Sequence, residues 1–148
     1  MNKVNLRIDI NVHIFKLHER AMKLKNMNID VDSEIHFVHV VPVILYARGL
    51  HLSAMTYPLM EERPKIEETI LAKLAEIKKE IFPNHKNITF KCLFDANEKM
   101  AFCDYVEHQQ PDLVVVATRS KHGISNFFDS SFAQFQCGHS SSNILVLR

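Results

Sequence analysis

The run Leu113-Val114-Val115-Val116-Ala117 has no polar side chain and directly follows Pro111 and Asp112. A short unbroken apolar run of this kind, bounded by turn residues, is typical of a strand buried on both faces of a parallel sheet. Residues 35–41 and 88–94 are rich in β-branched and aromatic residues, which also favours strands. Alternation of polar and apolar residues predicts a first strand over 4–12. The apolar residues 144–147 are predicted to form the last strand.

Helical periodicity separates these strands. The clearest helix is predicted over 66–81, with Pro64 before it, Pro83 after it and a single apolar face made by Ile66, Ile70, Leu74, Ile77 and Ile81. Weaker patterns predict helices over 14–24 and 128–138. Another should run from Asp95 and Glu98 through Val106, with these two acids forming a capping box. Strands and helices that alternate in this way predict one α/β domain over 1–148, with a doubly wound, mostly parallel five-stranded sheet.

The first strand conflicts with a central place in such a sheet. It carries Asn5, Arg7, Asp9 and Asn11 on one face, whereas a central parallel strand is usually apolar on both faces. Either Arg7 and Asp9 pair with each other there, or the strand is less central than this topology implies. The sequence leaves both explanations open.

Composition restricts the class of partner. Lys and Arg number 18 against 17 Asp and Glu, a net charge of +1, which gives no general attraction for nucleic acid or anionic lipid. No apolar run is long enough to span a bilayer and the N-terminus has no signal-peptide pattern, so we expect a cytoplasmic protein that binds neither nucleic acid nor membrane. The three widely spaced cysteines are expected to be reduced, two or more of them packed as small apolar groups.

The C-terminal residues carry a recognisable pattern: 111–123 read PDLVVVATRSKHG and 139–148 read HSSSNILVLR. This pattern resembles the C-terminal half of the universal stress protein family, in which an Asp-Leu-aliphatic strand leads into Gly-Thr-Arg-Gly-Arg-His-Gly and a His-x-x-x-Pro-aliphatic strand follows. The resemblance implies a three-layer α/β/α fold of the adenine nucleotide alpha hydrolase-like type. It also implies a homodimer formed by antiparallel pairing of the last strand, Ile144–Leu147.

ATP-binding members of that family hold the phosphates on a Gly-x2-Gly-x9-Gly-Ser/Thr loop. Position by position, the resemblance places Ala117, Ser120 and Ser130 where the family has glycine, and Ser131 at the hydroxyl position. Glycine lets backbone N–H groups close around an anion, and another residue forced to positive φ costs about 1–2 kcal/mol. The only glycines of this chain are Gly49, Gly123 and Gly138, none of them at a motif position.

The adenosine half of the family site also differs. The aspartate that engages the ribose corresponds to His13, and the backbone contact to adenine corresponds to Val41. Together with the lost glycines, this difference predicts ATP binding weakened by about two to four powers of ten. Arg119 lies in the loop after the fourth predicted strand, at the sheet edge where such folds bind ligands.

We therefore expect a non-enzymatic, dimeric stress-response protein that acts through protein contacts, with weak or no ATP binding and no cofactor. The alternative is an adenine-nucleotide sensor, for ATP or AMP, that uses Ser120, Ser130, Ser131 and Arg119 in place of the glycines. A slow nucleotide hydrolase has the least support, because no catalytic base is positioned. No metal site is expected, since residues 36 and 39, both histidines, are three apart on a strand and face opposite sides.

The connection over 42–63 is unusually long and rich in apolar side chains. Connections of this length are often functional. It is expected either to cap the pocket or contact a protein partner, or to fold back onto the helices of its own sheet.

Overall fold

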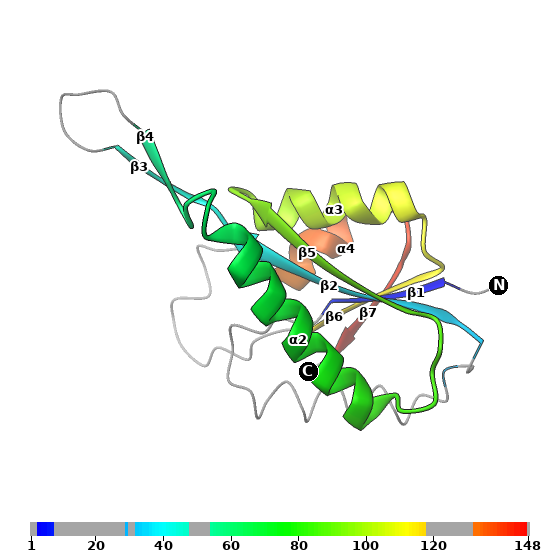
Figure 1. The fold of residues 1–148 in the computed structure, drawn as a ribbon. Helices are drawn as coiled ribbons and strands as arrows, with labels where there is room; N and C mark the ends of the chain where they lie inside the picture. The colour runs from blue at the N-terminus through cyan, green and yellow to red at the C-terminus, as the bar shows by residue number, and fades with distance from the viewer. Residues whose placement is uncertain (1–2, 8–28, 30–31, 48–53, 118–131, 148) are drawn as a thin grey trace, which may run out of the picture.

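A parallel five-stranded sheet forms the centre of the protein (Figure 1). The computed structural model describes residues 3–7, 29, 32–47, 54–117 and 132–147. The strand order is β5-β2-β1-β6-β7, and every neighbouring pair is parallel. The strands span Lys3–Arg7 (β1), Glu34–Pro42 (β2), Ile88–Asp95 (β5), Leu113–Ala117 (β6) and Asn143–Leu147 (β7).

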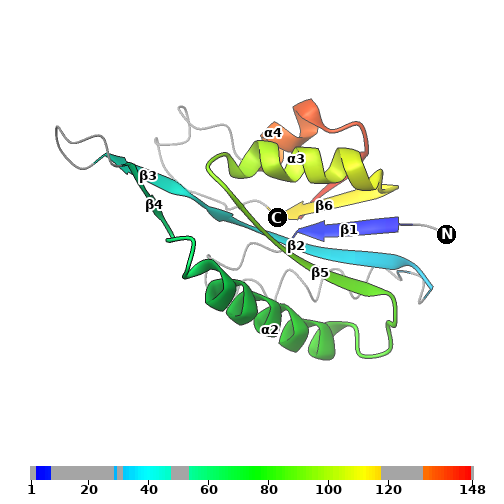
Figure 2. The same cartoon turned by 45° about the horizontal axis from the view of Figure 1, so that its top comes forward.

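Helices cover both faces of the sheet, which gives the expected three-layer α/β/α fold (Figure 2). The helix α2 (Arg63–Ile81) lies on one side, and α3 (Glu98–Gln109) and α4 (Phe132–His139) lie on the other. Because successive side chains of a strand point to opposite faces, β2 supplies both cores. Ile35 and Phe37 pack with the apolar face of α2, whereas Val38 and Val40 pack with α3 and α4.

The polar first strand is central after all. β1 pairs with β2 on one side and with β6 on the other, so the idea that it lies nearer an edge is wrong. The backbone N–H and C=O groups of β1 pair with β2 and with β6, and this pairing does not require apolar side chains. The pairing of Arg7 with Asp9 stays a prediction, because Asp9 and the rest of the predicted strand beyond Arg7 lie outside the described residues.

The other predicted strands are confirmed within one residue at each end, and two helix starts are corrected. α2 begins at Arg63, so Pro64 lies in its first turn, where its missing N–H costs nothing. α3 is capped by Asn97 instead of Asp95: the Asn97 side chain accepts the N–H of Met100 at 3.2 Å. Asp95 still belongs to β5, and its Oδ1 accepts the N–H of Asn97 at 2.8 Å.

Two further predictions fall partly or wholly on undescribed residues. The predicted helix over 14–24 lies outside the described residues. Of the predicted helix over 128–138, the described part is α4, which continues one residue farther, to His139.

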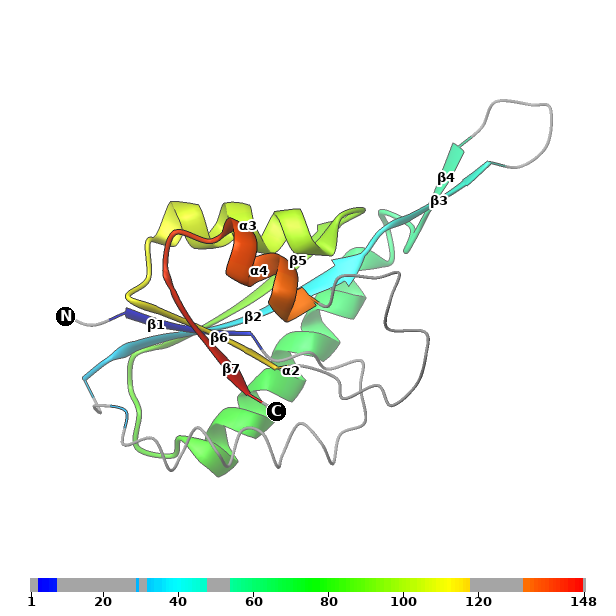
Figure 3. The same cartoon turned by 180° about the vertical axis from the view of Figure 1, so that it is seen from behind.

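The long connection contains a two-stranded antiparallel hairpin that the sequence did not predict. β3 (Ile44–Ala47) pairs with β4 (Ala54–Tyr57), and both strands project beyond the sheet and helices (Figure 3). Leu45 is 64% exposed and Tyr57 57%. These strands therefore do not fold back onto the helices of the sheet, and a role in partner contact stays a prediction.

Two further expectations from the sequence concern membrane-spanning helices and the cysteines. In the described segments, no helix is both long and apolar enough to cross a membrane. All three cysteines are free thiols; Cys92 and Cys103 are buried and Cys137 is exposed, so the expected packing of two of them is confirmed. Burial is the main reason that the pKa of each buried thiol is raised.

Candidate functional site

The carboxyl ends of the strands meet at one edge of the sheet, where ligands bind in folds of this class. Val41 lies near the end of β2, and Ala117 is the last residue of β6, paired with Leu147. The other predicted site residues lie outside the described residues: His13, Arg119, Ser120, Ser130 and Ser131. The structure thus locates two of the predicted positions, on strands that are separated in the sheet by β1.

The backbone at Ala117 is ordinary extended strand. Among the described residues, Gln110 is the only one other than glycine with a positive φ. Ala117 is therefore not strained in this structure, and the cost expected for side chains at the three glycine positions stays a prediction. A β-carbon there can still obstruct an anion that approaches the backbone, but Ala117 itself costs no conformational energy.

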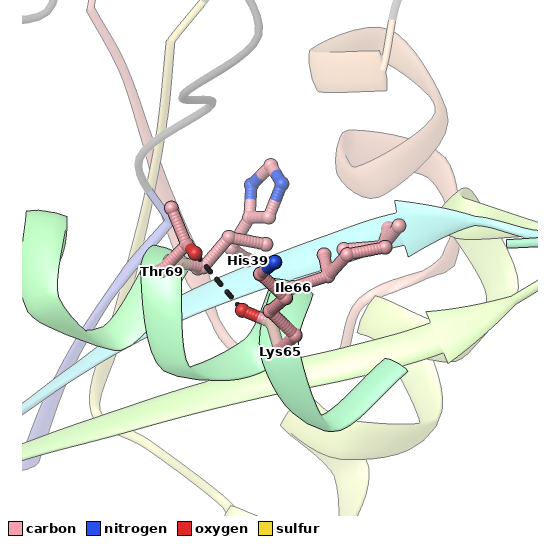
Figure 4. A pocket seen from close by; sticks show the side chains of 6 residues that line it. His39, Lys65, Ile66 and Thr69 are labelled. Carbon is pink, nitrogen blue, oxygen red and sulfur yellow. Dashed lines mark hydrogen bonds between the residues drawn. The ribbon is translucent and has the colours of Figure 1, made fainter. Parts of the chain in front are cut away.

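A hollow of about 370 Å³ lies beside Val41, between β2 and the N-terminal half of α2 (Figure 4). Its walls are His39, Val41, Lys65, Ile66, Thr69 and Ile70. The two-residue period of β2 places residues 39 and 41 on the α2 side, and the helical period brings residues 66 and 70 to the same side of α2. No residue of the described hairpin lines this hollow.

The walls combine apolar surface with one buried imidazole. Val41, Ile66 and Ile70 are partly exposed to the hollow and to solvent. His39 is only 2% exposed, and in the sheet it pairs with Cys92 of β5. Figure 4 shows Lys65, Ile66 and Thr69 on the helix across from His39 on the strand.

The end of α2 that borders this hollow carries charges of both signs, with Arg63 and Lys65 in the first turn and Glu61 and Glu62 just before it. The first turn of α2 contains no acidic residue, and its N-cap, Glu62, makes no side-chain capping hydrogen bond. The Glu62 carboxylate instead accepts the N–H of Leu59 at 3.0 Å. Arg63 lies with its guanidinium carbon 5.4 Å from the ring centroid of Phe94, the residue paired with Val41. Two cations thus lie at the positive end of the helix dipole, the reverse of the usual arrangement.

The hydroxyl of Thr69 already donates a hydrogen bond within α2. It donates to the carbonyl oxygen of Lys65 at 2.9 Å, the dashed line in Figure 4. The Lys65 side chain is exposed, and no carboxylate of the described residues forms an ion pair with it. The ammonium group of Lys65 is therefore available to a ligand at the rim of the hollow.

The second strand histidine, His36, belongs to a different environment on the opposite face. Its Nε2 lies 2.9 Å from Oε1 of Glu34, and its Nδ1 lies 2.8 Å from the hydroxyl of Tyr105 on α3. Burial, together with the nearby Glu34 charge, raises the pKa of Tyr105. His36 and His39 therefore face opposite sides as predicted, and the described residues contain no metal-binding group of three or more His, Cys, Asp or Glu.

Sequence reasoning located Val41 through the family resemblance but missed His39, Lys65 and Thr69 as neighbours. The alternation of side chains along β2 and the four-residue spacing of Ile66 and Ile70 on α2 each predict which residues face the interior. Neither pattern tells which helix packs against which strand.

The layered α/β/α architecture and the sheet order, together with the family match that follows, are those of the adenine nucleotide alpha hydrolase-like fold. The model of the Universal stress protein family matches residues 16–148, and the chain belongs to that family. No curated protein sequence matches this chain closely enough to indicate a relative.

Solved structures of low sequence identity share the fold. One is a universal stress protein in complex with cAMP, with a TM-score of 0.66 and 10% identity over 100% of this chain and 98% of that one. Another is the universal stress protein from Archaeoglobus fulgidus in complex with dAMP, at 0.59 and 13%, covering 100% and 98%. A third is an Arabidopsis thaliana family protein with AMP bound, at 0.53 and 16%, covering 97% and 90%.

Proposed function

We propose that this chain is a cytoplasmic, non-enzymatic stress-response protein that acts as a homodimer through protein contacts and binds ATP weakly or not at all. The observation that carries the proposal is the set of residues at the phosphate-binding positions of the family. Ala117, Ser120 and Ser130 stand there, and no glycine of the chain falls at any of these three positions. A triphosphate needs backbone N–H groups on several sides at once, which side chains at these positions obstruct.

Restoring the glycines tests this proposal directly. Calorimetric titration of the natural chain with ATP is expected to give no micromolar affinity. The triple variant Ala117→Gly/Ser120→Gly/Ser130→Gly is expected to bind ATP at least tenfold more tightly. Ser141→Gly is the matched control, because Ser141 is an exposed residue on the turn before β7, at the opposite end of the sheet. Micromolar ATP affinity in the natural chain would contradict the proposal.

The two edges of the sheet support the dimer. β7 lies at one edge, and its sequence NILVL contains no charged residue. β5 lies at the other edge and carries the charged residues Lys91 and Asp95, both exposed. Charged side chains protect an edge strand from pairing with another chain, so the β7 edge is the one open to a second copy.

A lysine at each edge distinguishes them. Leu147→Lys, at the end of β7, is expected to lower the sedimentation coefficient from the value of the dimer to the value of the 17.2 kDa monomer. Thr89→Lys, at an exposed position of β5, is expected to leave the dimer intact. Circular dichroism establishes that both variants remain folded. A natural chain that sediments as a monomer at micromolar concentration would refute the dimer.

A second candidate function is an adenine-nucleotide sensor, in which Ser120, Ser130, Ser131 and Arg119 hold the phosphate. The observation that favours it is that three solved structures of this fold hold cAMP, dAMP or AMP. Titration with AMP separates the candidates, since a monophosphate needs fewer of the lost backbone contacts than ATP. Tight AMP binding that Arg119→Gln abolishes would establish the sensor in place of the first proposal.

The absence of catalysis is tested by incubating the protein with ATP and measuring release of ADP and phosphate. No turnover above the buffer rate is expected. Turnover that Ser130→Ala removes would instead make the chain a hydrolase.

A further inference from the structure

The hollow beside Val41 has the size and lining of a small-molecule site. Its volume of about 370 Å³ lies within the range of ligand pockets, roughly 300–1,000 Å³. Its lining includes three aliphatic side chains, Val41, Ile66 and Ile70, and its surface is mainly apolar. Apolar surface that stays partly exposed in the free protein favours a ligand that covers it with hydrocarbon.

The rim of the same hollow is cationic. Lys65 lines it and has no carboxylate partner among the described residues. Arg63, two residues earlier, lies over the ring of Phe94, and its Nε is buried without a hydrogen-bond partner in the described structure. Arg63 and Lys65 lie in the first turn of α2, and Glu61 and Glu62 lie just before it. The attraction for the negative charge of a ligand therefore depends on the unpaired ammonium of Lys65, which lines the hollow itself.

We propose that this hollow binds a small apolar carboxylate, with its hydrocarbon against Val41, Ile66 and Ile70 and its anionic group at Lys65. One negative charge suffices, because Lys65 is the one ammonium group among the described residues that line the hollow. The buried His39 imidazole also belongs to the lining, beside the aliphatic walls. The site uses none of the phosphate-loop positions, but it shares Val41 with the adenine contact of the family, so binding of ATP and binding of the carboxylate are measured in separate titrations.

A neutral analogue isolates the contribution of the charge. Octanoate and octanamide have the same chain length, and only the first carries a charge at pH 7. An exposed ion pair is worth at most about 1 kcal/mol, which corresponds to about fivefold in affinity. Octanoate is therefore expected to bind roughly two- to fivefold more tightly than octanamide. The titration, followed by nuclear magnetic resonance, is expected to show methyl chemical-shift changes at Val41, Ile66 and Ile70.

Two lysine variants of one helix complete the experiment. Lys65→Gln is expected to remove the preference for octanoate and to leave octanamide affinity unchanged. Lys78→Gln is the matched control, because Lys78 lies in the last turn of the same helix, 3.4 Å from the carbonyl oxygen of Pro83. It is expected to preserve the preference.

Three results would overturn the proposal: equal affinities for octanoate and octanamide, an unchanged preference in Lys65→Gln, or shift changes that saturate at other methyl groups. A separate ATP titration of the same samples reports on the phosphate-loop proposal, so each idea can fail without the other.

Discussion

Removing one hydroxyl group, in Tyr105→Phe, tests whether His36 is a structural histidine held by its neighbours. An ionised carboxylate can only accept, so the Nε2 of His36 carries the proton that Oε1 of Glu34 accepts at 2.9 Å. In the tautomer with this proton on Nε2, the Nδ1 atom accepts the Tyr105 hydroxyl, at 2.8 Å. His36 is 4% exposed, so solvent cannot readily replace that hydroxyl.

The expected loss of stability follows from this burial. A net hydrogen bond contributes about 1 kcal/mol, and a buried acceptor left without a partner costs about 1–3 kcal/mol. Tyr105→Phe keeps the ring, whose centroid is 6.1 Å from that of His36, so little packing is lost. We expect the free energy of unfolding to fall by about 1–3 kcal/mol, and the Tm by roughly 2–4 °C for each kcal/mol.

Urea unfolding at pH 7.5 measures this difference. Tyr57→Phe is the matched control, because Tyr57 is 57% exposed and its change should stay within about 0.5 kcal/mol. A double-mutant cycle with His36→Phe is expected to show a coupling of about 1 kcal/mol between the two side chains. A Tyr105→Phe effect as small as that of the control, or a coupling of zero, would refute the reasoning.

Three further changes test the packing and the titration of the core. Phe102→Ala removes a fully buried ring, 5.5 Å by centroid from that of Phe132, and is expected to cost about 3–5 kcal/mol in thermal or urea unfolding. Asn97→Ala removes the side-chain cap of α3 and should cost about 1 kcal/mol, whereas the exposed Asn84→Ala should cost almost nothing; equal effects would contradict the cap assignment. Burial raises the pKa of Cys92 from 9.0 to about 11, so the unfolded chain releases its thiol proton first and stability should fall as pH rises from 9 to 11. Cys92→Val should flatten that slope in unfolding measured between these pH values, and an unchanged slope would assign it to other groups.

The sequence predicted the strands well where burial is nearly complete. Val114, Val115 and Val116 are 0–2% exposed, and such a run has few alternatives to a central parallel strand. The helix α2 was equally clear, because its apolar face repeats from Ile66 to Ile81. In both cases one local pattern and the tertiary environment agree.

The hairpin shows where local pattern was insufficient. Ile44 and Leu45 are consecutive apolar residues, and both are exposed in the structure, at 46% and 64%. Neither alternation nor an Asn-Gly type turn marks these strands, so periodicity could not identify them. The cap of α3 failed for a related reason: Asp95 and Asn97 are both good capping residues, and only the length of β5 decides between them.

The candidate site divides in the same way. Val41 could be predicted from the family resemblance, because its position along the chain can be matched to the family even where the surrounding residues differ. Lys65 could not, because it becomes part of the hollow only when α2 packs against β2. Such a contact depends on tertiary structure between segments about 25 residues apart, which no short spacing encodes.

The central place of β1 also has a consequence for synthesis of the protein on the ribosome. Val4 pairs with Ile35 on one side but with Leu113 on the other. At elongation rates of about 5–20 residues per second, the nascent chain therefore waits roughly 5–20 s with one edge of β1 unpaired. During that interval the emerging polypeptide exposes an open strand to chaperones and to neighbouring ribosomes, and only the arrival of β6 closes it.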